Sequence, residues 1–292
     1  MGKGSSPKVV PTAKGEGNYI SDNKMNPSWD KRIGRAVELA NRYAFAKEAL
    51  VFYRTLTSYQ KDVYQHLESL RDGRDGLPSL EEELPLYILL PRFPSFVSLI
   101  RREGPPRLAK LAEELSKMRE EDLGVMLQSY WREKALNTIE NRAMSFFPKA
   151  FLQPYAECLA DAHGGAVDGL AESASLCPLC NGRPQVGCLR PADNGMKRSL
   201  VCSLCLAEWR FRRLSCPSCG EDSNDKFPYY TTKDYPNIRL EACNSCGKYI
   251  KTVDMTKNPE AVPVVDELAT IPLDLWAHEQ GYKKIEDNVL GI

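Results

Sequence analysis

The chain has few of the residues from which catalytic sites are usually built, and it has no excess of charge of either sign. Its three histidines, His66, His163 and His278, form no recognisable catalytic dyad. Lysine plus arginine equals aspartate plus glutamate at 39 each, so no global attraction to nucleic acid or to an anionic membrane is expected. A glycine-rich phosphate-binding loop is also missing. The sequence therefore predicts no enzyme, and its neutral charge argues against nucleic-acid binding.

Long hydrophobic runs are absent as well. The most apolar stretch, Leu84 to Phe93, is too short and too interrupted by proline to cross a bilayer. Residues 1–27 mix glycine, serine, proline and lysine without an apolar run, so they predict a disordered tail and not a secretory signal. We therefore expect a cytoplasmic protein without membrane insertion. In a reducing cytoplasm, paired cysteines are better explained by metal binding than by structural disulfides.

Cysteine is the residue that the chain uses in an unusual pattern. Eight of its ten cysteines form four C-x-x-C pairs, namely Cys177/Cys180, Cys202/Cys205, Cys216/Cys219 and Cys243/Cys246. Two residues between the sulfurs let each pair curl into a knuckle whose thiolates point to one side. Two knuckles complete a tetrahedron around zinc or iron. These eight residues are therefore the predicted ligands of two metal ions.

The order of the knuckles favours one pairing over the other. Cys180 and Cys202 are separated by 21 residues and Cys219 and Cys243 by 23, just beyond the usual two-knuckle ribbon spacing. Pairing the first knuckle with the second and the third with the fourth closes the shorter loops, and crossed pairing is the alternative. Four thiolates leave no open position for a catalytic water, so no catalytic residue is predicted.

The predicted fold class is α+β, with the helices first. Residues 28–170 predict an all-α bundle with short connections, in which neighbouring helices pack antiparallel. One long amphipathic helix ending at the turn from Asp72 is indicated by apolar residues every three or four positions: Phe45, Ala49, Phe52, Leu56, Tyr59, Val63, Leu67 and Leu70. Three further stripes follow: Leu108, Leu111, Leu115 and Met118; Leu127, Tyr130, Trp131, Ala135, Thr138 and Ile139; and, after Pro148, Phe151, Leu152, Tyr155 and Leu159.

The second half predicts two tandem rubredoxin-like or zinc-ribbon modules with short antiparallel strands. Their predicted bounds are residues 171–214 and 215–292, and the second includes a helical tail over Glu260 to Tyr282 with Val265, Leu268, Leu275 and Trp276 on its apolar side. Strands of this length cannot build a core alone, so bound metal must supply much of the folding free energy. The expected strands are 199–202, 207–214, 226–232, 237–242 and 248–254.

The residues alone leave several roles open for the knuckles. They can hold structural metal, a single iron as in rubredoxin, or redox-active thiols, although no βαβ pattern supports the last. Cys158 is expected to be a small buried hydrophobe and Cys188 a spare thiol in a strand or turn. Alternation places Arg210 and Arg212 on one strand face beside the first site, as in a solvated strand.

The knuckles and their neighbours resemble the formate dehydrogenase accessory protein family, often called FdhE, over roughly residues 145 to 285. The segments that carry the resemblance are Leu152–Glu157, Arg198–Cys205, Glu208 with Trp209, Arg213, Cys216–Cys219, Glu241–Lys251, Val265–Thr270 and Glu279–Tyr282.

This resemblance implies an N-terminal helical domain followed by two rubredoxin-like modules. It implies a cytoplasmic, non-enzymatic factor needed for active formate dehydrogenase, whose client is the molybdenum-containing catalytic subunit before its export by the twin-arginine route. The eight knuckle cysteines carry over as metal ligands, with iron favoured and zinc the alternative. We predict an assembly factor for formate dehydrogenase. The alternatives are a tandem zinc-ribbon module that binds nucleic acid or protein, and a C-x-x-C thiol oxidoreductase.

Overall fold

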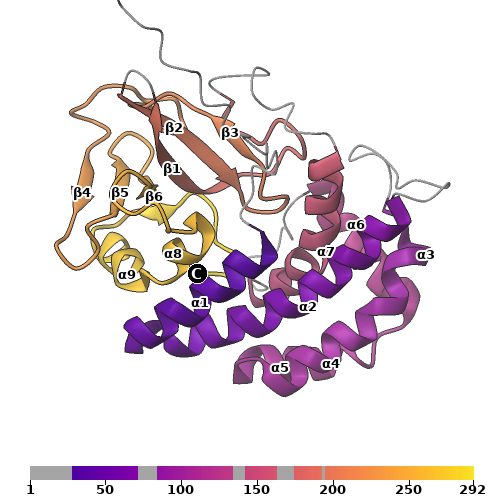
Figure 1. Ribbon diagram of the computed structural model, residues 1–292. Coiled ribbons are helices and arrows are strands. Elements are labelled where there is room, and N and C mark those ends of the chain that lie inside the picture. Colours follow the sequence, from indigo (N-terminus) through magenta and orange to yellow (C-terminus); the bar gives the residue numbers. More distant parts are fainter. Residues whose placement is uncertain (1–27, 72–83, 134–141, 163–173, 193–194) are drawn as a thin grey trace, which may run out of the picture.

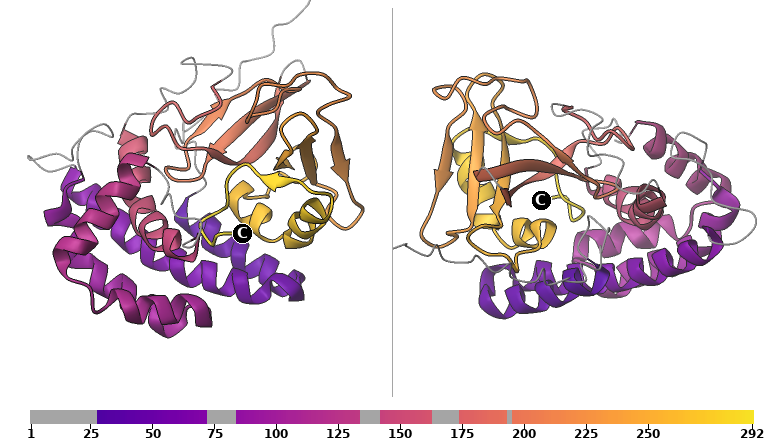
Figure 2. Two further views of the ribbon diagram at one scale, coloured as in Figure 1. Left: turned by 180° about the vertical axis from the view of Figure 1, so that it is seen from behind. Right: turned by 45° about the horizontal axis from the view of Figure 1, so that its top comes forward.

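The computed structural model of the chain describes residues 28–71, 84–133, 142–162, 174–192 and 195–292. It consists of a helical half and a sheet half that lie side by side, with the C-terminal helices between the sheet and the first helix pair (Figure 1). Two further views show the same arrangement (Figure 2). The predicted fold class is therefore confirmed.

The first two helices form an antiparallel hairpin. Helix α1, Trp29–Arg42, begins at Ser28, whose Oγ accepts a hydrogen bond from the Lys31 backbone N–H at 3.3 Å. A 3₁₀ turn, Ala44–Ala46, leads into α2, Lys47–Arg71. The ring of Trp29 lies 5.5 Å from that of Tyr64, so the start of α1 packs beside the later part of α2.

The apolar stripe that the sequence predicts for α2 is buried in the middle of the helix but not at its two ends. Phe52, Leu56, Val63 and Leu67 are buried in the main core. Phe45, in contrast, precedes the helix and is 52% exposed. Leu70 is exposed as well. The turn that was predicted after Asp72 lies outside the described residues.

The remaining helices of this half surround one strongly buried helix, α7, Arg142–Ala162. Pro148 and Pro154 lie inside α7, whereas the sequence suggested a helix break at Pro148. Phe147 and Leu152 are fully buried, so tertiary packing holds the helix through both prolines. The others are α3, Leu86–Leu89; a 3₁₀ turn, Leu90–Arg92; α4, Phe93–Glu103; α5, Pro106–Leu115; and α6, Glu120–Glu133. Met118 follows α5 and is exposed, and Ala135, Thr138 and Ile139 lie outside the described residues.

A single mixed sheet joins the two predicted modules. Its strands are β1, Pro184–Ala192; β2, Gly195–Cys202; β3, Glu208–Arg210; β4, Tyr229–Thr231; β5, Ile238–Cys243; β6, Lys248–Asp254; and β7, Lys283–Lys284. The order is β3-β2-β1-β6-β5-β4, and β7 pairs with β6. The pairing of β1 with β6 is parallel and connects strands of different modules, whereas the sequence suggested antiparallel strands within each. The predicted domain boundaries remain predictions.

The C-terminal helices connect the sheet to the helical half. They are α8, Pro263–Leu268, and α9, Ile271–Glu279, where the sequence suggested one continuous helical tail. Helix α8 contacts β1, β6 and α1. Val265 and Leu268 are buried as predicted, but Leu275 is 58% exposed, so its placement on the apolar side was wrong.

Two buried ion pairs hold α1 in place. Arg32 donates to Glu157 of α7 at 2.6 and 3.1 Å, and Arg35 donates to Asp266 of α8 at 2.6 and 2.9 Å. Helix α1 is thereby linked to both halves of the molecule. None of the helices in the described part of the chain combines the length and apolar character that a membrane span needs.

Candidate metal centres

The structure gathers the eight knuckle cysteines into two clusters. Cys177, Cys180, Cys202 and Cys205 form the first cluster, and Cys216, Cys219, Cys243 and Cys246 form the second. Within each cluster all four sulfurs lie within 4.8 Å of one another. This is the sequential grouping that loop closure favoured.

The sulfur spacing fits a four-thiolate metal ion. A tetrahedron with metal–sulfur bonds of about 2.3 Å has edges of about 3.8 Å between its sulfurs. In the first cluster Cys177 and Cys205 are 3.5 Å apart and Cys180 and Cys202 are 3.4 Å apart. In the second, the spacing is 3.8 Å for Cys216 and Cys246 and 3.6 Å for Cys219 and Cys243. Both clusters could therefore hold a zinc or iron ion.

Each knuckle has the same backbone form, because the residue after its second cysteine has a positive φ. These residues are Asn181 at 60°, Leu206 at 57°, Gly220 at 79° and Gly247 at 67°. This reversal closes the turn: the backbone N–H of Gly220 donates to the Cys216 carbonyl oxygen at 2.9 Å, for example. Two glycines serve the second cluster, whereas the first uses asparagine and leucine.

Backbone donors also point at the sulfurs. The N–H of Leu204 donates to Cys202 Sγ at 3.4 Å, and that of Ser218 donates to Cys216 Sγ at the same distance. Such bonds stabilise the thiolate, the form in which cysteine binds metal. Four thiolates so close together repel one another, and a bound cation would supply the compensating charge.

The thiol pKa values show this mutual influence within the clusters. Hydrogen bonds from neighbouring thiols, first from Cys177, hold the pKa of Cys180 well below its usual value. Burial is the first cause that raises the pKa of Cys202, and it raises that of Cys216 as well. Thiols of unequal acidity at this spacing are suited to lose their protons together when a cation binds.

The two clusters differ in their surroundings. All four cysteines of the first are buried in the main hydrophobic core, with exposed fractions of 4% or less. Gly182 lies against this cluster so closely that a Cβ there would meet Cys202 Sγ at 2.9 Å. In the second cluster Cys216 and Cys243 are buried beside Phe227, Cys246 is partly exposed and Cys219 is exposed.

A buried arginine connects the two clusters. Arg198 of β2 is fully buried and donates to the carbonyl oxygens of Arg212 and Ser215 at 2.9 and 3.1 Å, just before Cys216. Its guanidinium also binds the carboxylate of Glu241, two residues before Cys243. The segments that carry the second cluster are therefore anchored on a strand that ends at the first.

The other candidate residues lie away from the clusters. Cys158 is buried in the helical core, as predicted, and Cys188 is buried in β1, where burial raises its pKa. His66 is partly buried on α2 and His278 is exposed on α9. Arg210 and Arg212 are exposed, as expected for a solvated strand face, and His163 is outside the described residues.

A buried charge cluster was missed by sequence reasoning. Lys251 of β6 binds Glu267 at 2.9 Å and Asp274 at 2.5 Å, and Lys284 binds the same two carboxylates. Tyr249 completes the cluster by donating to Asp274 at 2.8 Å. The residue pattern of β6 did not indicate this cluster, because the carboxylates that bind Lys251 come from helices α8 and α9.

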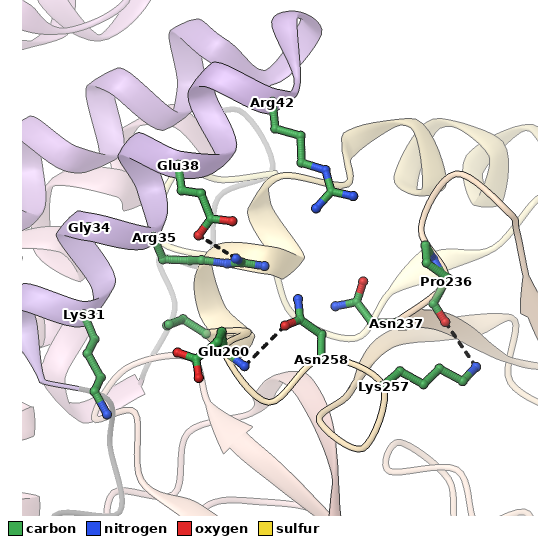
Figure 3. A pocket seen from close by; sticks show the side chains of 11 residues that line it. Lys31, Gly34, Arg35, Glu38, Arg42, Pro236, Asn237, Lys257, Asn258 and Glu260 are labelled. Atoms are coloured by element: carbon green, nitrogen blue, oxygen red, sulfur yellow. Dashed lines mark hydrogen bonds and ion pairs between the residues drawn. The ribbon is translucent and has the colours of Figure 1, made fainter.

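A separate pocket of about 920 Å³ lies between α1 and the loops around Asn237 and Asn258. Figure 3 shows two interactions that involve charged side chains in this pocket: Arg35 contacts Glu38, and Lys257 donates to the Pro236 carbonyl oxygen. Its lining residues include no cysteine, histidine or serine that could act as a nucleophile.

Comparison with known proteins gives a consistent result. The sequence pattern described as "FdhE, C-terminal domain" matches residues 214–290. The chain is 26% identical over 271 residues to the "Protein FdhE homolog" of Aquifex aeolicus (strain VF5), covering 89% of this chain and 94% of that one. It is 23% identical over 289 residues to "Protein FdhE" of Salmonella choleraesuis (strain SC-B67), covering 97% and 90%.

A shorter match at higher identity exists with the "Protein FdhE homolog" of Stutzerimonas stutzeri (strain A1501), at 38% identity over 122 residues, or 41% of this chain and 39% of that one. The crystal structure of the FdhE protein from Pseudomonas aeruginosa matches with a TM-score of 0.62 and 24% identity, covering 91% of this chain and 97% of that one. At this identity, the structural match speaks for the fold.

Proposed function

We propose that the chain belongs to the FdhE family, to which it is similar along almost its whole length, and that it is a cytoplasmic accessory factor for formate dehydrogenase. It binds the catalytic subunit of a molybdenum-dependent formate dehydrogenase and is needed for its maturation or redox activation. The observation that carries this proposal is the pair of four-cysteine clusters, found within a chain similar to FdhE proteins along almost its whole length. The twin-arginine export of the client belongs to the same proposal.

The eight cysteines are the proposed ligands, four to each ion. The donor set supports this, because closely spaced sulfurs with tetrahedral edges suit both zinc and iron. The family resemblance favours iron. When bound, zinc would supply folding free energy, and iron would add a one-electron redox couple. The residues themselves hold the ion, and the N–H groups of Leu204 and Ser218 stabilise the thiolates.

We propose a non-enzymatic role because each cluster uses four protein sulfurs. A tetrahedral ion bound in this way has no position left for substrate or water. In the first cluster, burial of all four cysteines adds a second barrier to any reactant. The ion would therefore shape the protein or carry an electron, and the client would be recognised by the protein surface.

Affinity capture from the native organism tests the client. We expect the tagged full chain to recover the catalytic subunit of formate dehydrogenase. Deletion of the gene for this chain should abolish formate dehydrogenase activity while the catalytic subunit is still synthesised. The matched control is the Glu113→Gln variant, which changes an exposed charge, keeps all eight cysteines and should recover the subunit as the wild type does. Absence of the subunit from the eluate, together with normal activity in the deletion strain, would overturn the proposal.

The rivals predict different observations. A nucleic-acid-binding zinc ribbon would show a salt-sensitive complex that uses the exposed Arg210 and Arg212. A thiol oxidoreductase would reduce disulfides without metal and would need one knuckle only. Metal analysis of protein purified without oxygen tests whether the protein acts by redox activation. Stoichiometric zinc would exclude that role and leave only maturation.

A further inference from the structure

The two cysteine clusters are embedded so differently that they cannot exchange metal equally well. The first belongs to the main hydrophobic core, and its cysteines are 3%, 4%, 0% and 0% exposed. The second sits in a small separate cluster with Phe227, and Cys219 reaches solvent. The same ligand chemistry is thus placed in two environments.

Metal exchange at a four-thiolate site depends on this difference. One thiolate must leave the ion and take up a proton while an incoming donor takes its place. Where all four sulfurs are enclosed, this requires local opening of the core. Where one sulfur faces water, a small thiol or a chelator can reach that edge of the ion directly.

The first cluster is enclosed on several sides. Gly182 approaches Cys202 Sγ and Cys180 Sγ, with Cβ distances of 2.9 and 3.2 Å if a side chain were added. Tyr130 of α6 is buried in the same hydrophobic core as these two cysteines. Gln153 of α7 also donates to the Ser203 carbonyl oxygen at 3.4 Å, between Cys202 and Cys205. Release of an ion here would separate the sheet from the helices.

The residues between Cys243 and Cys246, at the rim of the second cluster, are hydrogen-bonded to neighbouring side chains. Ser245, between Cys243 and Cys246, donates to the Glu221 carboxylate at 2.6 Å, and its neighbour Asn244 accepts from the Tyr282 hydroxyl at the same distance. Both residues are themselves exposed, as is Cys219. The edge of the cluster that contains Cys219 and Cys246 therefore lies at the protein surface.

We propose that the second cluster is an exchange site, which takes up and releases a soft divalent ion through the Cys219 and Cys246 edge. The first cluster keeps its ion as a permanent part of the core. The incoming ligand is a small thiol or a multidentate soft donor, and the step is ligand substitution without a change of oxidation state. This inference rests on the proposed function only in that both clusters bind metal.

Pulsed alkylation of the zinc-loaded full chain with N-ethylmaleimide, read by peptide mass spectrometry, tests the edge without any variant. We expect Cys219 and Cys246 to be modified first, and the four cysteines of the first cluster at least about tenfold more slowly, because their release requires opening of the core. Modification of Cys177 or Cys205 at the same rate as Cys219 would overturn the inference.

Transfer of zinc to the chromogenic chelator 4-(2-pyridylazo)resorcinol gives a second readout. Two phases of one equivalent each are expected, and Cys219→Ser/Cys246→Ser should lose the fast one and keep the slow one. Ser218→Ala is the matched control, since it alters the rim without removing a ligand, and it should keep both phases. A single phase of two equivalents would refute the exchange site. Protein that binds no metal would instead refute the proposed metal sites.

Discussion

Replacing Glu241 by glutamine should destabilise the protein more than any exposed charge change, because this carboxylate compensates a fully buried cation. Glu241 is 2% exposed and binds Arg198, which is 0% exposed, as well as Arg239 at 2.5 Å. Removing one partner of a buried ion pair costs about 3–5 kcal/mol. Glutamine keeps one acceptor oxygen, and Arg198 keeps its two carbonyl partners. We therefore expect the lower end, about 3 kcal/mol.

Thermal unfolding of the metal-saturated protein, followed by circular dichroism, measures the effect. A loss of about 3 kcal/mol lowers the midpoint by about 6 °C at this chain size. Glu113→Gln is the matched control: Glu113 also binds two cations, Arg101 and Lys117, but all three side chains are about half or more exposed. Because these exposed ion pairs are screened by solvent, its midpoint should stay close to that of the wild type. A midpoint for Glu241→Gln no lower than that of Glu113→Gln would refute the reasoning.

Three further predictions concern the buried charge cluster and the first metal site. Burial raises the pKa of Glu267, but Lys251 and Lys284 outweigh it and lower the pKa from 4.5 to about 2. The stability that this carboxylate contributes is complete above about pH 4.3 and is lost as the pH falls towards 2. In urea titrations, Glu267→Gln should therefore be about 3 kcal/mol less stable than wild type near neutral pH and approach it below about pH 3. Metal loss at low pH affects the wild type and Glu267→Gln alike. A difference in stability between them that does not change with pH would therefore contradict the lowered pKa of Glu267. Gly182→Ala should weaken zinc binding by the first cluster in chelator competition, since its Cβ would press on Cys202 Sγ. Gly34→Ala, whose Cβ would meet nothing within 4 Å in α1, should instead add about 1 kcal/mol of stability. Stripping both ions with excess chelator should speed amide hydrogen exchange in β1 to β6 before α2, because the strands depend on the sites; uniform exchange would argue otherwise.

The ligand clusters could be predicted from the sequence because their determinants are local. A knuckle needs two cysteines, two residues between them and a tight turn, all within a few positions. Loop length favoured the sequential grouping, with crossed pairing as the alternative. The helical half was predictable where α2 repeats its apolar residues regularly, and unpredictable at Phe45, where the contact partner Tyr235 is far away in sequence.

Strand β1 was missed because its composition argues against a strand. It contains Pro184, Gly187 and Pro191, which normally mark turns. The structure explains the glycine: a Cβ at Gly187 would meet Thr252 Oγ1 of β6 at 2.4 Å. Close approach of β1 to β6 thus requires glycine, and this is the contact that merges the two modules into one sheet.

The residue after each knuckle shows why the two clusters depend on the fold to different degrees. Gly220 and Gly247 adopt positive φ without strain, so the second cluster can form its turns with little support. Leu206 adopts φ of 57° at a cost of about 1–2 kcal/mol. Its side chain is 4% exposed, and burying a leucine contributes about 1.5–3 kcal/mol, which offsets that cost only while the helical core is packed against it. The first cluster is therefore coupled to the helices through its own backbone, whereas the turns of the second need no such packing.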